Sequence, residues 1–370
     1  SDFKNTSSSF FNLAEFGADI GLNFPRIFFP FNTDGIIPKS MSPETRFSLG
    51  TTLQKNIGLD KQTFNGILRY KWKPTNQRQN IVELLNIQYV KNLNTDRYYD
   101  VYDNSYGDLN DVADNYTQVA DTSYYNSNGD LVIPDGTSGF TNDVLDGSIT
   151  TSQSDYNEVS RLEDRRDRLT ANNLIFSSNY TYFKNNRRNV NDNNFFQFRG
   201  KIEFAGNLLS ALAPIVDFEQ NEDGKNLIFG VQYSQYVKTE LDYIKYWRLS
   251  RSNVLAFRSF LGIAIPYGNA DNIPFIRSYF AGGSNDNRAW QPYSLGPGRT
   301  DNVNDFNEAN LKIAFNLEYR FNLIGDFKGA LFADAGNIWN FLDNVDEEEA
   351  VFEDFKSLKE KFFILSLFTN

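Results

Sequence analysis

The stretch that decides the fold is IPFIRSYFAGGSNDNRAWQPYSLGPGR, residues 273–299. It pairs two adjacent glycines, Gly282 and Gly283, with two prolines, Pro292 and Pro297, on its returning half. Glycine takes positive φ and lets backbones approach closely, whereas proline fixes φ and stiffens the chain. Composition alone would also fit a plain cluster of surface turns that exposes a solvated arginine. The order of the residues favours a shaped loop instead.

Three short motifs follow one another in this loop. They read FAGG at residues 280–283, NRAW at 287–290 and GP at 296–297. Their order and spacing resemble the sixth extracellular loop of the BamA/TamA family of outer-membrane protein assembly factors, which carries an aromatic-Gly-Gly step, an Arg-Gly-aromatic step and a Gly-Pro. One residue departs from the family, because Ala289 stands where glycine is usual. The sequence of this loop is most similar to the TamA-like branch of Bacteroidetes, often called TamL. The resemblance assigns the loop motif to Gly282, Gly283, Arg288, Trp290, Gly296 and Pro297.

The amino-acid inventory excludes most catalytic chemistry. The 370 residues include no Cys and no His. Disulfides, thiolate chemistry and His-based acid/base mechanisms are therefore excluded, and the usual ligands of zinc are absent. Paired carboxylates also occur in glycosidases, but nothing else in the sequence supports an active site. The sequence predicts no enzyme, no metal and no cofactor.

The polarity of the chain fits a membrane barrel better than a helical membrane protein. Aromatic residues make up 16% of the chain, while the mean hydropathy is −0.50. A transmembrane helix needs about 20 consecutive apolar residues, and the sequence contains no such run. In a membrane barrel only alternate strand residues face lipid, and aromatic residues gather at both interfaces. The net charge of −11 argues against a nucleic-acid partner, because phosphates attract basic surfaces.

Alternation with a period of two predicts an all-β chain of about ten or eleven strands. The clearest segment is 311–321, where Leu311, Phe315 and Leu317 alternate with polar residues that include Asn316 and Glu318. Such a segment is a two-faced strand. The predicted strands span residues 16–24, 47–53, 64–72, 81–90, 174–182, 196–204, 237–247, 255–265, 311–321 and 327–339. Long and short connections alternate between them, which is typical of an antiparallel transmembrane barrel with long extracellular loops.

The longest interruption of the strand pattern covers residues 92–168. It is rich in Asp, Asn, Ser, Gly and Tyr, and far exceeds the usual loop length of about 12–15 residues. We expect a solvated extracellular lobe, with 156–168 as a candidate for a short surface helix. Several aspartates lie here, but their spacing lacks an EF-hand template for calcium. They are Asp100, Asp103, Asp108 and Asp111. A second substantial loop contains a predicted helical turn at 207–213.

The family resemblance implies that residues 1–370 are a partial C-terminal barrel domain. Barrels of the family have sixteen strands and are preceded by periplasmic POTRA repeats, which this sequence does not contain. We therefore expect the chain to begin in the middle of a longer protein. The acidic run at 346–349 and the final KFFILSLFTN fall short of the family's closing strands. The loop that enters the barrel lumen is expected at residues 271–306.

The resemblance also implies a contact inside the barrel. In the family, the arginine of the loop is held by acidic residues of the lumen wall. By position, Arg288 is that arginine, Glu318 is a wall acid, and Phe332 and Asp334 are the partner pair. The alternation independently places Glu318 and Asp334 on the polar face. Arginine suits the role because its planar guanidinium group can donate hydrogen bonds to two carboxylates at once. The alternative is that both acids are simply wet lumenal carboxylates.

Finally, the resemblance implies a function without bond chemistry. The family inserts outer-membrane proteins or translocates substrates through a weak barrel seam, so the expected location is the bacterial outer membrane. The implied partners are the lipid bilayer with its lipopolysaccharide, unfolded outer-membrane protein clients, accessory lipoproteins and a TamB-like partner. A passive diffusion channel or nutrient receptor would share the barrel but would not need the loop motif.

Overall fold

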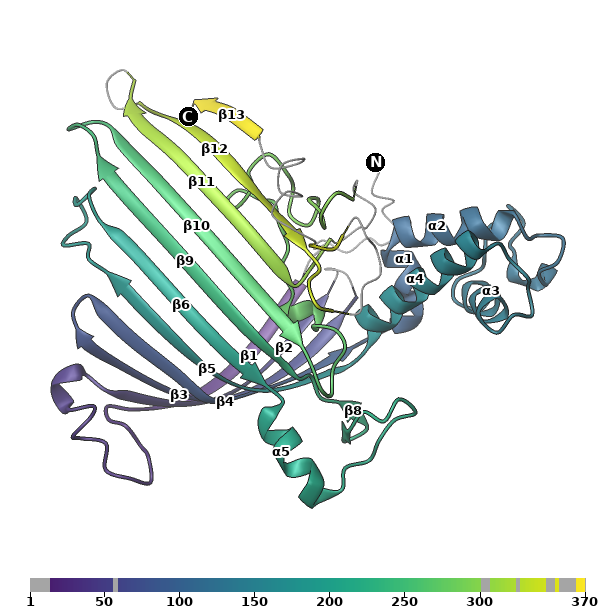
Figure 1. The fold of residues 1–370 in the computed structure, drawn as a ribbon, viewed down its shortest axis with the longest axis horizontal. Helices are drawn as coiled ribbons and strands as arrows, with labels where there is room; N and C mark the ends of the chain where they lie inside the picture. Colours follow the sequence, from purple (N-terminus) through teal and green to yellow (C-terminus); the bar gives the residue numbers. More distant parts are fainter. Residues whose placement is uncertain are drawn as a thin grey trace. The chain divides into compact units, whose positions relative to one another are not determined.

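The computed structural model describes residues 14–55, 59–300, 307–323, 327–343 and 350–352, and the backbone of 364–369. Within these residues, eleven strands form one sheet in the order β1-β2-β3-β4-β5-β6-β9-β10-β11-β12-β13 (Figure 1). The predicted all-β antiparallel fold is confirmed. The expected acidic run at 346–349, and the end of the expected lumen loop at 301–306, lie outside the described residues.

The strand bounds follow the predicted segments closely and extend most of them by a few residues. The sheet contains β1 (Ala14–Phe24), β2 (Glu44–Lys55), β3 (Lys61–Thr75), β4 (Arg78–Asn92), β5 (Asn173–Asn185), β6 (Phe196–Ala205), β9 (Tyr236–Arg248), β10 (Val254–Pro266), β11 (Leu311–Asn322), β12 (Lys328–Trp339) and β13 (Ile364–Thr369). From β5 to β13, each strand pairs antiparallel with its neighbour in the sheet. A separate two-stranded sheet joins β7 (Leu227–Ile228) to β8 (Val231–Gln232).

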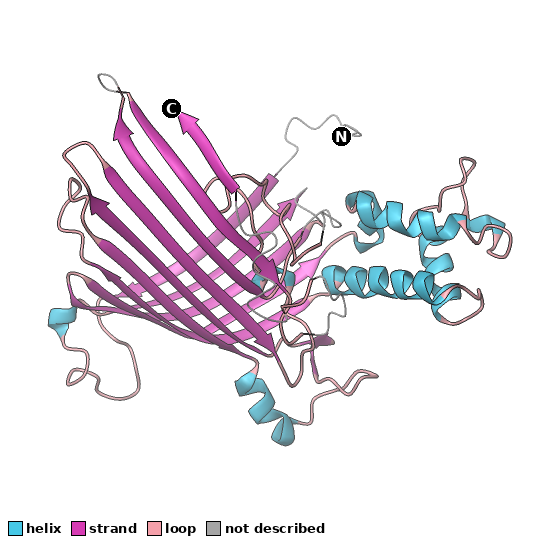
Figure 2. Cartoon of the chain, turned by 45° about the horizontal axis from the view of Figure 1, so that its top comes forward, coloured by secondary structure: helices cyan, strands magenta, loops and turns pink. Residues whose placement is uncertain are grey.

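The described part of the chain forms two compact units. The first comprises the described residues of 1–20, 49–65 and 88–172, and the second those of 21–48, 66–87 and 173–370. The candidate site lies wholly in the second unit. The first unit contains most of the helices, which are coloured cyan in Figure 2.

The two faces of the sheet in the second unit are sorted in the opposite way to a water-soluble protein. Leu241 and Leu261 are paired across β9 and β10, and both are exposed. On the other face, the charged residues Glu203, Lys238 and Asp334 are buried. Charged side chains are seldom buried unless they are paired. The apolar face is therefore the outward one, and the buried charges belong to a network that the next section describes.

The last strand lies in a segment where alternation predicts none. Residues 364–369 form β13, which pairs antiparallel with β12 from Gly329↔Thr369 to Asp334↔Ile364. The ending KFFILSLFTN is largely a continuous apolar run, and periodicity alone does not separate a strand from a helix in such a run. The pairing with β12 therefore identifies this strand, and the sequence pattern does not.

The segment expected as a solvated extracellular lobe, residues 92–168, contains more helix than the short surface helix expected within it. The segment folds into η2 (Thr95–Arg97), α1 (Tyr98–Val101), α2 (Asp103–Asp114), η3 (Thr122–Tyr124), α3 (Asp135–Leu145) and α4 (Gln153–Thr170). We call residues 93–172 the helical insertion. Its own core contains Leu109, Phe140, Val159 and Leu162, all fully or almost fully buried. The sequence obscures this core because its few apolar residues are scattered among many polar ones.

The longest helix of the insertion contains the predicted surface helix and extends beyond it. The side chain of Ser152 accepts a hydrogen bond from the backbone N–H of Asp155 at 3.1 Å, which caps the start of α4. Asp155 also lies in the first turn, where a negative charge complements the helix dipole. Val159, Leu162 and Leu169 recur at helical spacing and are buried. This apolar stripe packs one side of α4 into the core of the insertion, while its other side, with Asn157 and Asp164, is exposed at the surface.

Deletion of the helical insertion is expected to leave the sheet folded, because its two ends already lie side by side. The backbone N–H of Asn92 donates to Oδ1 of Asn172 at 2.9 Å, and Nδ2 of Asn92 donates to the backbone O of Ala171 at 2.7 Å. A short Gly-Ser linker can therefore replace residues 95–170. Heat-dependent gel migration and circular dichroism in detergent should still report a β-rich folded form. Loss of that form would contradict the prediction.

Three further elements lie outside the strands and outside the helical insertion. The predicted helical turn at 207–213 is confirmed as α5 (Asn207–Val216) and is longer than expected, and η1 (Lys39–Met41) and η4 (Phe275–Arg277) are single turns. Within the described ranges, no helix combines the length and the apolar character that crossing a bilayer requires.

Candidate functional site

The loop between β10 and β11 is closed at its neck by the backbone. The N–H of Tyr279 donates to the O of Ala309 at 2.7 Å, and the N–H of Ala309 donates back to Tyr279 at 2.9 Å. The ring of Tyr279 also packs against Phe260 of β10, with centroids 6.0 Å apart. The two limbs of the loop are therefore held together where they leave the sheet, so the loop beyond the neck starts from a fixed position.

The paired glycines make the first sharp turn beyond the neck. Gly282 and Gly283 have φ of 102° and 100°, which disfavours any residue with a Cβ. A Cβ on Gly282 would lie 2.1 Å from the backbone O of Gln291. The N–H of Gly283 donates to the O of Trp290 at 2.8 Å. The glycines thus let the outgoing limb touch the returning limb, as the sequence predicts for a shaped loop.

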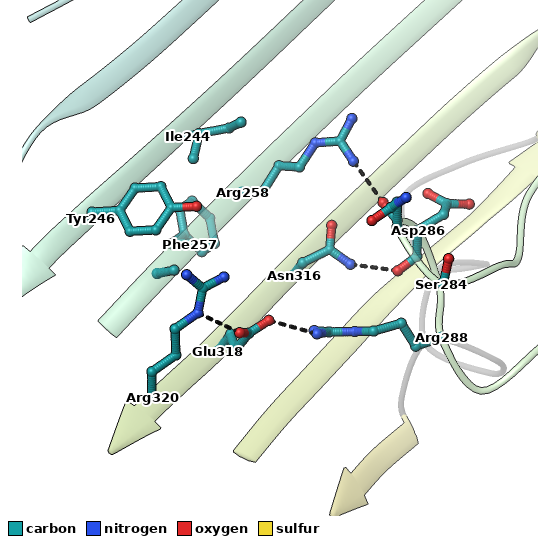
Figure 3. Close-up of a pocket in the computed structure, with 12 residues that line it drawn as sticks. Ile244, Tyr246, Phe257, Arg258, Ser284, Asp286, Arg288, Asn316, Glu318 and Arg320 are labelled. Atoms are coloured by element: carbon teal, nitrogen blue, oxygen red, sulfur yellow. Dashed lines mark hydrogen bonds and ion pairs between the residues drawn. The ribbon is translucent and has the colours of Figure 1, made fainter. Parts of the chain in front are cut away.

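Asp286 fixes the inside of this turn to the sheet. Its Oδ2 accepts from the backbone N–H of Gly282 at 2.9 Å and from Nζ of Lys312 in β11 at 2.8 Å. Its backbone O accepts from Nδ2 of Asn316 at 2.8 Å. Next to it, Nη1 of Arg258 in β10 donates to the backbone O of Asn285 at 3.0 Å (Figure 3). Three wall residues therefore hold the loop tip before Arg288 is reached, and none of the three is predicted as a site residue from the sequence.

Arg288 is the centre of the site and joins the loop to two strands. Its Nε and Nη2 donate to the two oxygens of Asp334 at 2.8 and 2.7 Å, and its backbone N–H adds a third bond to Asp334 at 3.1 Å. Its Nη1 donates to Oε2 of Glu318 at 2.7 Å, as Figure 3 shows. The guanidinium carbon lies 3.7 Å from the centre of the Phe332 ring. We call these four residues the Arg288 latch.

The two acids of the Arg288 latch are held differently. The Asp334 side chain is 3% exposed and also accepts from Nδ2 of Asn316 at 2.9 Å. It is therefore buried, and both of its oxygens accept hydrogen bonds. The Glu318 side chain is 21% exposed and is shared with Arg320. Glu318 also borders a cavity of about 600 Å³ that reaches Arg320 and Lys328. Water therefore screens the Glu318 contact more than the Asp334 contact.

Arg288 stays charged in this environment. Its burial opposes the charge, but the hydrogen bonds to Asp334 and Glu318 outweigh that effect, so the pKa of Arg288 lies above its ordinary value. The Arg288 latch therefore keeps its cation at any physiological pH. The neighbouring Ala289, which replaces the family's usual glycine, is not among the described non-glycine residues with positive φ. An alanine is thus compatible with the backbone at this position.

A glycine of β12 makes room for the loop tip. A Cβ on Gly336 would lie 3.0 Å from Nδ2 of Asn287 and 2.6 Å from the backbone O of Ile313. Asn287 directly precedes Arg288 and is fully buried. The glycine that follows Asp334 at a spacing of two is therefore needed for close approach. The motif ADAG is visible in the sequence, but Gly336 is not among the predicted site residues.

The returning limb of the loop is fixed to the end of β12. The N–H of Gly298 donates to the O of Ile338 at 2.7 Å, and Nδ2 of Asn337 donates to the O of Gly298 at 2.6 Å. Gly296 has φ of 74°, and a Cβ there would lie 2.4 Å from Oδ1 of Asn337. Trp290 packs against the buried apolar cluster that includes Ile338. The motif residues Trp290, Gly296 and Pro297 thus lie on the limb that returns along β12.

A second charged cluster holds the base of the loop, and sequence reasoning misses it. Glu203 of β6 is 1% exposed and accepts from the hydroxyl of Tyr236 and from Nζ of Lys201, each at 2.7 Å. Arg277 of the loop lies 3.3 Å from Glu203 and donates from Nε to the Tyr236 hydroxyl at 3.1 Å. Nζ of Lys238 donates to the backbone O of Arg277 at 2.7 Å. We call these five residues the base cluster.

The predicted site residues are thus brought together, and others join them. The loop motif and the wall residues Glu318, Phe332 and Asp334 meet on the polar face of β11 and β12. The base cluster adds β6 and β9 to the wall. Its members give no sequence signal because lysine, glutamate and tyrosine on the polar face of a strand are common.

Comparison with known proteins gives one family and one fold. A family model described as the Omp85 superfamily domain matches residues 2–359. The structure is similar to the crystal structure of BamA from Haemophilus ducreyi lacking POTRA domains 1–3, with a TM-score of 0.52 and 12% identity over 88% of this chain. The match covers 50% of the BamA chain, so this chain spans about half of that length. No protein with a curated description matches the sequence. The likeness shows the BamA-type antiparallel barrel fold.

Proposed function

Because this chain belongs to the Omp85 superfamily, we propose that it is an outer-membrane β-barrel that assembles outer-membrane proteins or translocates substrates without bond chemistry. The observation that carries the proposal is the Arg288 latch. A loop that leaves the sheet after β10 is tied by one arginine to both β11 and β12. The loop therefore fixes these two strands of the wall relative to its own tip.

The proposed mechanism uses the energy of an unpaired strand edge. Backbone groups that lack a partner are costly in lipid, where no water replaces the missing hydrogen bond. An incoming strand of an unfolded client can satisfy these groups by adding to the edge. The Arg288 latch supports this by holding the loop, β11 and β12 in a fixed arrangement within the barrel wall. No residue of the site needs to act as an acid, a base or a nucleophile.

The proposed partners follow from the same picture. The exposed apolar face of the sheet fits the lipid bilayer with its lipopolysaccharide, and the seam fits unfolded outer-membrane proteins. Accessory lipoproteins and a TamB-like partner belong to the finer proposal that the chain is of the TamL branch found in Bacteroidetes. The loop motif quoted above, including the alanine at 289, supports that branch.

The competing function is a passive diffusion channel or a nutrient receptor. The loop argues against an open channel, because residues 285–288 lie on the polar face and are tied to β10, β11 and β12. In planar bilayers the purified protein should show small and unstable conductance. A large and stable conductance would favour the channel.

The location in the membrane has its own test. The protein is expected to require detergent for solubility and to migrate on mild gels in a heat-dependent way, because a folded barrel resists unfolding by detergent at room temperature. Circular dichroism in detergent should be β-rich. A protein that stays soluble and folded without detergent would contradict the proposed location.

The assembly function is tested with vesicles that contain the purified protein. An unfolded outer-membrane protein is added, and its folded, heat-modifiable form is followed over time. Folding should be faster than in vesicles with a porin-type barrel, and Arg97→Ala in the exposed pair with Asp100 of the helical insertion should not change it. Equal folding rates in both kinds of vesicle would contradict the proposed assembly function.

A further inference from the structure

Helix α5 carries an apolar face that the described part of the chain does not cover. Its sequence, NLLSALAPIV, contains no charged residue, and none of its residues is buried. Leu208, Leu212 and Ile215 are 52%, 38% and 80% exposed. Their spacing of four and three residues puts them on one side of a helix. A soluble surface helix would show polar residues there.

The opposite side of α5 is fixed to the second unit by polar contacts. The Ser210 hydroxyl lies 2.9 Å from the Tyr233 hydroxyl and donates to Oε1 of Gln235 at 2.8 Å. Gly206 begins the helix with φ of 76°, and a Cβ there would lie 2.6 Å from the backbone O of Ser234. These contacts set the rotation of α5 about its axis. The apolar face is therefore turned outward by the structure and not left free to rotate inward.

The strand register shows where α5 leaves the sheet. Ala205 at the end of β6 pairs with Tyr236, and Tyr236 pairs with Pro266 at the end of β10. Helix α5 therefore begins at the same end of the sheet as the loop that carries Arg288. Figure 1 shows α5 directly beyond the end of β6. In an outer-membrane barrel of the proposed kind, this end faces the cell exterior.

The apolar face of α5 continues the exposed apolar face of the sheet. Phe204, the last outward residue of β6, is exposed and is separated from α5 by only two residues. Leu241 lies on the same face of β9, since its parity matches Val237, the partner of Phe204. Phe229, in the connection that follows α5, is 99% exposed. Exposed apolar side chains thus lie on both sides of the junction between β6 and α5.

We propose that α5 lies in the membrane interface of the outer leaflet, with Leu208, Leu212 and Ile215 in the acyl region. This inference rests on the proposed outer-membrane location. Lipid is the occupant that fits, because α5 directly follows the outward-facing end of β6 with its exposed Phe204, and α5 offers no charge to a headgroup or to a charged protein partner. Apolar burial alone must then hold it. Its insertion should not depend on salt or on the share of anionic lipid.

The test uses single cysteines, since the natural chain has none. A fluorescent label is attached at Leu212→Cys, and at Ile215→Cys in case the first substitution disturbs the fold. Leu241→Cys on β9 is the control for the lipid-facing strands, and Glu222→Cys in the connection after α5 is the control for solvent. Each variant is reconstituted in phosphatidylcholine vesicles with brominated acyl chains, with and without phosphatidylglycerol. Quenching by bromine reports lipid contact, and quenching by iodide reports solvent contact.

We expect the α5 labels and the Leu241→Cys label to be quenched several-fold more by brominated lipid than the Glu222→Cys label, with no change on adding phosphatidylglycerol or salt. The idea is overturned if the α5 labels respond to iodide while the Leu241→Cys label responds to bromine, because the barrel is then inserted and α5 is not. Shielding of the α5 labels from both quenchers would show a protein cover and would also overturn it. If the Leu241→Cys label itself responds to iodide, the proposed membrane location has failed, and the inference with it.

Discussion

Replacing Arg288 with alanine is expected to free the loop from the wall and to give the largest loss of assembly activity among single substitutions in the loop. Removing one partner of a buried ion pair costs about 3–5 kcal/mol, whereas an exposed pair contributes about 0–1 kcal/mol. The side chain of Arg288 is 18% exposed, and its two acids are 3% and 21% exposed. The loss should therefore fall between these limits and come mostly from Asp334.

The measurement is protease cleavage within residues 284–295, followed in detergent, beside the vesicle assembly assay. Arg288→Lys is the matched control: it keeps the charge but has no planar fork for both oxygens of Asp334. It should recover only a minor part of the protection. The barrel should still reach the membrane in both variants. Unchanged cleavage in Arg288→Ala would show that the Arg288 latch does not hold the loop.

A double-mutant cycle separates the two acids. The coupling free energy between Arg288→Ala and Asp334→Ala should exceed that between Arg288→Ala and Glu318→Ala, because the Arg288 side chain donates two bonds to Asp334 and one to Glu318. The charge swap of Arg288→Glu with Glu318→Arg should recover only part of the loss, since Asp334 would then face a like charge. Simple additivity of the losses for both acids would refute the contact.

Replacing Glu203 with alanine is expected to destabilise the barrel itself and not only the loop. Glu203 is 1% exposed and is the common partner of Tyr236, Lys201 and Arg277. Without its carboxylate, the Tyr236 hydroxyl, Lys201 and Arg277 lose their common acceptor. Because the Lys201 and Arg277 side chains are 26% and 19% exposed, the loss should lie between about 1 kcal/mol for an exposed pair and about 3–5 kcal/mol for a buried pair. The temperature at which the heat-modifiable form is lost should fall clearly.

Two further variants locate the origin of this effect. Glu203→Gln keeps an acceptor for the Tyr236 hydroxyl but removes the charge, so its loss should be intermediate. Glu222→Ala, an acid of the exposed connection after α5, should behave as the unchanged protein. If Glu203→Ala is as stable as the parent, the base cluster is screened by water and does not support the wall.

Most strands and their two faces follow from local sequence patterns. In β11 and β12, alternation alone assigns Glu318 and Asp334 to the polar face, because side chains on a strand alternate strictly. The ordered glycines, arginine and Gly-Pro of residues 280–297 likewise indicate the loop, since only a few residue types tolerate such a backbone. Strand alternation and the backbone preferences of single residues are local properties, so a short stretch of sequence is enough to predict them.

Contacts between distant segments account for what the sequence pattern does not predict. The helical insertion has a core because α2 and α3 both pack on α4 and so bury residues such as Leu109 and Phe140, while each helix alone is weakly apolar. The base cluster forms because the loop places Arg277 next to Glu203 of β6, which is distant from it in the sequence. The burial of Asp334 and the greater solvent exposure of Glu318 follow from how the loop tip covers the wall. Spacing along the sequence contains no record of such packing, because burial and partner choice arise only when the strands and the loop are in place.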